Sequence, residues 1–126
     1  MERFTDNHDE TITDNKTGLI WMKDANYLRR RKSWKEAIGA CKELGTGWRL
    51  PTIQELLSLI DYLQFELALP QGHPFINVQS SWYWSATTYA SNTSRAWVVY
   101  LSHGCVDFDH KIYNGDVWPV KGKKKC

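Results

Sequence analysis

The feature that most constrains the fold is the order of the periodic patterns, because helical patterns come first and strand patterns come last. The segments SWKE at 33–36 and TIQE at 52–55 are capping boxes, in which a hydroxyl and a glutamate satisfy the amides of a first helical turn. Each is followed by apolar residues at helical spacing, and Gly45 predicts the end of the first helix. Alternation typical of strands follows at 81–90, 95–102 and 105–110. Helices early and antiparallel strands late predict an α+β fold.

Each expected helix has one apolar stripe, so both should lie on the outside of a shared core. The stripes are Trp34, Ala37, Ile38, Cys41 and Leu44 in the first helix, and Ile53, Leu56, Leu57 and Ile60 in the second. An earlier β-hairpin is expected from the runs 11–13 and 19–22, which flank turn residues at 15–18. Residues 63–79 should be irregular, and His73 there is interpreted as structural.

The length and the charge of the chain limit the classes of function that it can have. A chain of 126 residues is expected to form one domain over 1–126, with 122–126 as a mobile tail. A net charge of +2 gives no support for binding nucleic acid, and no apolar run approaches the ~18 residues of a membrane span. The basic run at 29–32 is interpreted as a solvated loop, with an anion contact as the alternative. Three cysteines without CxxC spacing imply neither a disulfide framework nor a zinc site.

The dipeptide His103-Gly104 predicts a two-residue turn between the last two alternating runs. In that register Tyr100 lies opposite Asp107 and Val98 lies opposite Asp109. One face then holds Trp97, Val99, Leu101, Val106, Phe108 and His110, and is expected to face the core. The opposite face holds Val98, Tyr100, Ser102, Cys105, Asp107 and Asp109.

This second face mixes aromatic, apolar and acidic side chains, which favours a recognition surface. The alternative is a sheet face covered by a loop such as 63–79. Catalysis is not supported, because the register places His110 away from Cys105 and no third group orients a thiol–imidazole pair. Asp107 and Asp109 alone are too few ligands for a divalent metal. We therefore expect a protein that is not an enzyme and needs no cofactor.

Four motifs in order resemble the bacterial collagen-like adhesin C-terminal (Lcl C-terminal-like) family: FTDNHDETITDNKTGLIWMKD, GWRLPTIQELLSLID, YWSATTYASNTSRAWVVYLSHGCVD and VWPVKG. The resemblance covers residues 3 to 122. It implies a C-type-lectin-like fold, in which two helices pack on a small, twisted antiparallel sheet and the chain ends lie close together. Trp84, Trp97 and Trp118 match its framework.

Relatives of this kind are extracellular recognition modules, and some are variable proteins of diversity-generating retroelements. The resemblance implies that the ligand-binding positions are Val98, Tyr100, Ser102, His103, Cys105, Asp107, Asp109, His110, Ile112, Tyr113, Asn114 and Asp116. The implied partner is a protein or glycan on a cell or virus surface, bound outside the cell without direct insertion into a membrane. A structural domain for oligomerisation or docking remains the alternative.

The chain departs from the family at two positions. It has His8-Asp9-Glu10 where relatives have a glycine-flanked aspartate in the first hairpin, so that turn should differ. It has Trp118 where many relatives carry a cysteine that could pair with one in the first helix, so Cys41 lacks that partner. The calcium-and-sugar tripeptides of animal C-type lectins are absent as well, which gives no support for calcium-dependent sugar binding.

Overall fold

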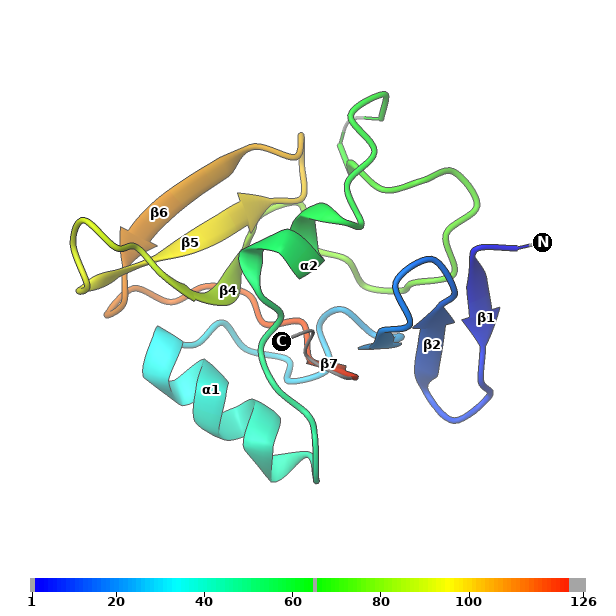
Figure 1. Ribbon diagram of the computed structural model, residues 1–126, viewed down its shortest axis with the longest axis horizontal. Helices are drawn as coiled ribbons and strands as arrows, with labels where there is room; N and C mark the ends of the chain where they lie inside the picture. Colours follow the sequence, from blue (N-terminus) through cyan, green and yellow to red (C-terminus); the bar gives the residue numbers. More distant parts are fainter. Residues whose placement is uncertain (1, 65, 123–126) are drawn as a thin grey trace.

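The computed structural model describes residues 2–64 and 66–122, and within them the chain forms two helices and two antiparallel sheets (Figure 1). The elements are β1 (Phe4–Asp6), β2 (Thr11–Asp14), β3 (Ile20–Met22), α1 (Trp34–Glu43), α2 (Ile53–Leu57), β4 (Trp82–Thr88), β5 (Arg95–Tyr100), β6 (Val106–His110) and β7 (Val120–Lys121). The predicted α+β class is confirmed. The expectation of a single sheet is wrong, because the early hairpin and the late strands form separate sheets.

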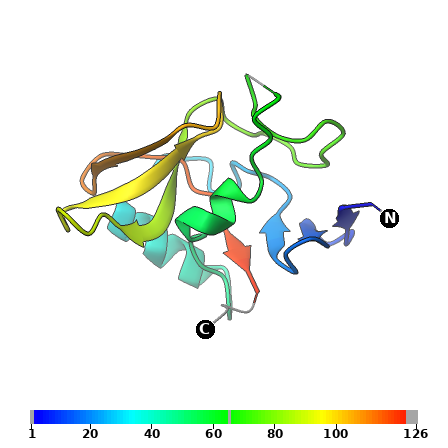
Figure 2. The same ribbon diagram turned by 45° about the horizontal axis from the view of Figure 1, so that its top comes forward.

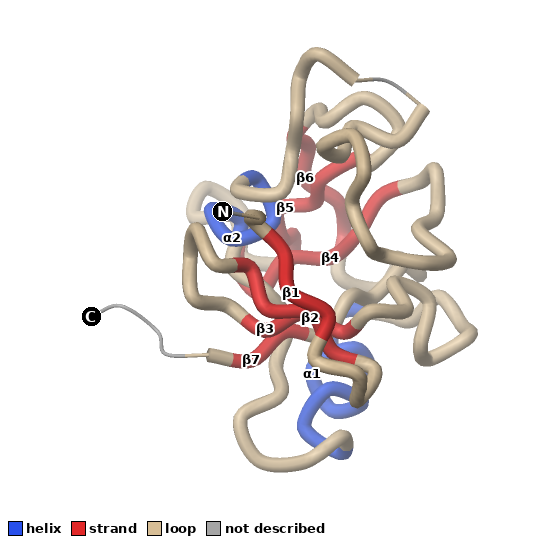
Figure 3. The backbone as a smooth tube through the Cα atoms, turned by 90° about the vertical axis from the view of Figure 1, so that its right-hand side faces the viewer, coloured by secondary structure: helices blue, strands red, loops and turns tan. Residues whose placement is uncertain are grey.

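The first sheet has the order β1-β2-β3-β7 and joins the two ends of the chain. The predicted early hairpin is confirmed, since Ile12 pairs with Trp21 across β2 and β3. Strand β1 was not expected from the sequence, and it adds an edge to this hairpin. At the other edge, Val120 pairs with Trp21, so the last strand of the domain closes onto the first hairpin (Figure 3).

Both helices begin where the capping boxes predict. Ser33 and Glu36 cap α1 reciprocally, and Thr52 and Glu55 cap α2 in the same way. The second helix is shorter than its apolar stripe predicts, because it ends at Leu57 and tighter turns follow to residue 60. No helix in the described part of the chain has the length and apolar character of a membrane span.

The second sheet has the order β4-β5-β6, and the two helices cover its opposite faces. Ala37 and Cys41 of α1 pack with Trp84, Ala96 and Val98 on one face. On the other face, Ile53 and Leu56 of α2 pack with Tyr83, Val99 and Leu101. Figure 2 shows α1 beneath this sheet and α2 beside it. The expected single shared core is therefore replaced by two clusters with the sheet between them.

Buried aromatic residues connect the second sheet to the early chain through their polar atoms. Trp84 Nε1 donates to the Lys32 carbonyl at 2.8 Å, and the Tyr83 hydroxyl donates to the Ala25 carbonyl at 3.0 Å. Trp118 Nε1 donates to the Met22 carbonyl at 2.9 Å. Because buried polar groups must be paired, these bonds fix where each loop crosses the core.

Two further predictions concern single residues. Cys41 is completely buried, as expected, and burial raises the pKa of its thiol to about 12, so it is unreactive at neutral pH. His73 has a structural role, because its Nδ1 accepts a hydrogen bond from the Phe75 amide and its ring stacks on that of Phe75. Of the predicted tail at 122–126, residues 123–126 lie outside the described part of the chain, and Cys126 is among them.

Candidate functional site

The hairpin of β5 and β6 is present, but its predicted register is wrong by two residues. Val99 lies opposite Val106, and Val98 lies opposite Asp107. The turn is longer than two residues, with Tyr100 N–H donating to the Cys105 carbonyl across it. The cause is Leu101, whose N–H donates to the Ser81 carbonyl and whose own carbonyl accepts from Ala68. With its backbone groups used elsewhere, Leu101 cannot pair with Val106.

A shift of two residues preserves which side chains share a face, but burial separates the predicted ligand-binding residues into two groups. Val98 is fully buried against α1 and Asp116 is only 5 % exposed, so the expectation that both face outward is wrong. The other predicted positions are half-buried or exposed: Tyr100, Ser102, His103, Cys105, Asp107, Asp109, His110, Ile112, Tyr113 and Asn114. They lie at the end of β5, in the turn after it, in β6 and in the loop that comes next. We call residues 102–114 the rim.

Arg31, in the loop before α1, contacts residues at the start of β4 and Asp116, which follows the rim. Its guanidinium lies 4.9 Å from the centroid of the Trp82 ring and donates to Ser81 Oγ at 3.2 Å. The Trp82 ring in turn lies against Gly115, where a Cβ atom would be 2.3 Å from the ring. The basic run is therefore not simply a solvated loop, because Lys32 also exchanges two backbone hydrogen bonds with Gly115. Neither Arg31 nor Trp82 was among the predicted ligand-binding residues, although an anion contact at 29–32 was the alternative interpretation of the basic run. No short-range pattern brings residues 31, 82 and 115 together.

A cavity of about 290 Å³ opens beside Arg31. Its lining residues are almost all polar or basic: Asn26, Arg29, Arg30, Arg31, Gln79, Ser80, Ser81 and Asp116. Guanidinium groups suit carboxylate, sulfate or phosphate groups, and the amides and hydroxyls suit hydroxyl groups. We call this hollow the Arg31 cavity.

Asp116 lines this cavity as a largely buried carboxylate. Burial raises its pKa, and Arg31 opposes that effect from 3.7 Å, measured between Arg31 Nε and Asp116 Oδ2. That separation is longer than a hydrogen bond, so the carboxylate keeps its capacity to accept. Tyr100 lies near the same guanidinium, and burial together with Asp107 and Asp109 raises the pKa of its hydroxyl.

Asp107 and Asp109 also have a structural task on the open edge of the sheet. Asp107 Oδ1 accepts from the Phe108 amide at 2.8 Å, and Asp109 Oδ1 accepts from the His110 amide at 3.0 Å. The Cys105 carbonyl and the Lys111 amide bond toward the β5 side, so the amides of 108 and 110 point away from it. An edge strand with unpaired amides invites pairing with another chain, and these carboxylates block that.

The face expected to be core is only partly covered. Tyr89 and Phe108 stack with ring centroids 4.1 Å apart, and Trp97 meets both rings edge-on. All three rings are half-buried, and Val106 beside them is 40 % exposed. The assignment of this face to the core holds for Val99 and Leu101 but is wrong for Val106.

The rim contains the Cys105 thiol and the imidazoles of His103 and His110, which lie close together in the sequence. Ser102 Oγ and His103 Nδ1 are 2.7 Å apart, and the His103 ring stacks on that of Tyr100. Cys105 is exposed. Among residues 2–64 and 66–122, no group of three or more His, Cys, Asp or Glu side chains is arranged to hold a metal ion. The arrangement offers hydrogen bonds, ring faces and charge, which are the means of recognition.

No curated protein and no solved structure matches this chain. The Lcl C-terminal domain family matches residues 10–121, which is nearly the whole chain and contains every element from β2 to β7. This range includes the Arg31 cavity and the rim, and it agrees with an adhesion-related bacterial module. The chain therefore belongs to the Lcl C-terminal domain family.

Proposed function

We propose that this protein is a ligand-binding domain without enzymatic activity, and that it serves adhesion at a bacterial or viral surface. The ligand surface would combine the Arg31 cavity with the rim. Two helices on opposite faces of a small sheet, with the chain ends joined in a second sheet, are compatible with the C-type-lectin-like fold that we propose for it. Function on such a fold depends on the site, so the proposal rests on the cavity.

The observation that carries the proposal is the composition of the Arg31 cavity. Three consecutive arginines line it, while its single carboxylate, Asp116, is buried beneath Arg31. Arg30 makes no side-chain hydrogen bond or ion pair within the described residues, so its charge is available to a ligand. The side chain of Arg31 is 44 % exposed although it already contacts Trp82 and Ser81. A preorganised guanidinium loses little conformational freedom when it binds an anion.

The chemistry favours an acidic glycan over a neutral one. Carboxylate or sulfate groups would pair with Arg30 and Arg31, and sugar hydroxyls would bond to Ser80, Ser81 and Asp116. Tyr113 of the rim, which is 56 % exposed, would supply one ring contact, and Tyr100 at the end of β5 would supply another.

Calorimetric titration of dextran sulfate, with neutral dextran as the control ligand, tests this proposal. Arg30→Gln should weaken binding about fivefold, because one charge-assisted contact is lost in a hollow that is partly shielded from solvent. Lys35→Gln removes the same charge from the exposed side of α1 and is the matched control. An equal loss of dextran sulfate affinity in both variants would show that only net charge matters and would contradict the site. Binding of neutral dextran with equal affinity would contradict the ligand class.

A finer proposal concerns the rim, which we infer to be the diversified region of a retroelement variable protein. The exposed rim side chains can change without disturbing the two buried clusters, as such diversification requires. Deep sequencing of the gene's last third in a natural population tests it. Substitutions gathered in codons 102–114, with a near-copy template and a reverse transcriptase gene nearby, are expected. An invariant rim would leave a binder of fixed specificity.

One observation favours assembly as a second function. Val106, Ile112 and Tyr113 are exposed apolar side chains on or beside β6, and Ile112 is 71 % exposed. Exposed apolar side chains mark a protein interface where they form a contiguous patch. Sedimentation over a range of protein concentrations separates the two functions, since a monomer at all concentrations would exclude self-assembly through the rim.

A further inference from the structure

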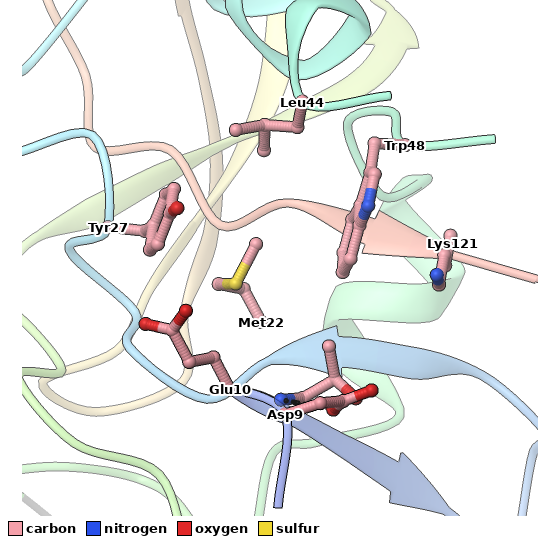
Figure 4. Close-up of a pocket in the computed structure, with 8 residues that line it drawn as sticks. Asp9, Glu10, Met22, Tyr27, Leu44, Trp48 and Lys121 are labelled. Atoms are coloured by element: carbon pink, nitrogen blue, oxygen red, sulfur yellow. Dashed lines mark hydrogen bonds between the residues drawn. The ribbon is translucent and has the colours of Figure 1, made fainter. Parts of the chain in front are cut away.

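A second hollow, of about 240 Å³, lies between the turn before β2 and the loop that follows α1 (Figure 4). Its walls are Asp9, Glu10, Thr11, Met22, Tyr27, Leu44, Trp48 and Lys121. Tyr27 lines it, whereas Asn26 and Arg29 on either side of Tyr27 line the Arg31 cavity. The two hollows therefore share a wall but differ in chemistry: one has three arginines, and the other has two carboxylates and two aromatic rings.

Aromatic and thioether groups form the inner wall. In Figure 4 the Met22 side chain lies between the rings of Tyr27 and Trp48, with Leu44 on one side and Glu10 on the other. Lys121 lies across Trp48 from Met22, and its ammonium is 4.9 Å from the centroid of the Trp48 ring. One face of this ring therefore already holds a cation, and in Figure 4 the other face is turned toward Met22, which lines the same hollow. Ring faces attract cations through their quadrupole, and a thioether is polarizable.

The two carboxylates differ in how they are used. Asp9 accepts hydrogen bonds from both the amide and the hydroxyl of Thr11, so it serves the turn. Within the described residues, Glu10 makes no side-chain hydrogen bond or ion pair, and in Figure 4 its carboxylate points toward the hollow. Glu10 also has a φ of +73°, which is unfavourable for a residue with a side chain. Its carbonyl accepts from the Lys23 amide, which holds this conformation in place.

We propose that this pocket binds an organic cation of the quaternary ammonium class. The cation would lie above Met22 between the Tyr27 and Trp48 rings, with Glu10 as its counter-charge. The volume is smaller than that of pockets for drug-sized ligands, which start at ~300 Å³, so it suits a head group and not a whole large ligand. A quaternary ammonium has no N–H donors to satisfy, which fits the half of the wall that consists of ring, thioether and aliphatic groups: Tyr27, Trp48, Met22 and Leu44.

Titration with choline, followed by amide and indole NMR signals of the intact chain, tests the proposal. Saturable shifts are expected at the Trp48 indole, Tyr27, Glu10 and Lys121. The neutral isostere 3,3-dimethylbutan-1-ol has the same shape without the charge, and it should bind about tenfold more weakly or not at all. Equal affinity for the two compounds, or no saturable shift with choline, would overturn the proposal.

Variants separate the counter-charge from a general loss of structure. Glu10→Gln should weaken choline binding about fivefold. Glu66→Gln is the matched control, because Glu66 is also exposed and also has a positive φ of +65° but lies outside the pocket. Lys121→Gln should strengthen binding about twofold by removing a like charge behind Trp48. Unchanged choline binding by Glu10→Gln would contradict the proposal, whereas dextran sulfate binding should be unaffected by Glu10→Gln in every case.

Discussion

Strands β5 and β6 are neighbours in one sheet and alternate similarly in sequence, yet their exposure is opposite. Ala96, Val98 and Val99 of β5 are completely buried, whereas none of the five residues of β6 is buried. β5 lies between two strands and between two helices, so both of its faces are covered. Alternation tells which side chains share a face, but the elements packed on that face decide whether they are buried.

The late chain therefore consists of a framework and a rim. The framework, which comprises β4, β5 and residues 115–118, has to keep its packing. The rim at 102–114 projects from the framework and is available for contact. Stability should therefore be sensitive to framework changes, and binding to changes in the rim and the Arg31 cavity.

The largest expected difference lies between two valines that face each other across the strands. Val99→Asp buries a charge without a partner and should cost about 4 kcal/mol, enough to unfold most of the protein. Val106→Asp should change the free energy of unfolding by less than about 1 kcal/mol. Urea denaturation measures both, and similar losses would show that β6 is covered in solution.

A smaller effect is expected where the rim returns to the framework. Gly115→Ala should cost about 2 kcal/mol, since a Cβ atom would overlap the Trp82 ring, which Arg31 covers. Gly39→Ala, in α1 with no neighbour within 4 Å of a new Cβ, should stabilise the protein by up to about 1 kcal/mol. Thermal denaturation of the two variants measures both effects. A Gly115→Ala variant as stable as the wild type would show that the Trp82 ring is not fixed there.

The edge carboxylates provide a third test. Replacing both Asp107 and Asp109 by alanine should cost about 1 kcal/mol and expose the amides of Phe108 and His110. Hydrogen exchange at these two amides should become faster, and self-association should increase. The double asparagine variant keeps an acceptor at each position and should restore protection. Unchanged exchange in the alanine variant would contradict the capping role.

The smallest effect concerns pH. The pKa of Asp116 is raised above 3.8 in the folded state, so the folded protein binds a proton more tightly there than the unfolded chain. Stability contributed by this group is therefore lost as the pH rises from about 3.8 through the raised folded pKa. Asp116→Asn removes that contribution, so its stability relative to the wild type should improve over this range. A constant difference between the two proteins would contradict the raised pKa.

Local signals predicted much of the fold and less of the site. The caps at Ser33 and Thr52 and the early hairpin follow from short-range chemistry and are confirmed. The register of β5 and β6 was wrong because Leu101 bonds to residues 68 and 81, and no local pattern reports such contacts. The outward placement of Val98 failed for the same reason, since α1 covers it from more than fifty residues away.

The Arg31 cavity lay beyond sequence reasoning because it is assembled from three distant segments. The run of arginines was visible, but its contacts with Ser81 and Trp82 depend on the three-dimensional fold. Gly115 was a signal of close packing in the sequence, but it was interpreted only as a turn residue. Its lack of a side chain is what lets the Trp82 ring lie flat against the backbone.

Ligand should contact the Arg31 cavity, Tyr100 and the rim, while the two buried clusters stay unchanged. NMR chemical-shift mapping with a short sulfated dextran fragment tests it most directly. Shifts are expected at residues 29–31, at Ser80, Ser81 and Tyr100, and along 102–114, with little change in β2 and β3. Shifts confined to β2 and β3, or spread evenly over all lysines and arginines, would contradict it.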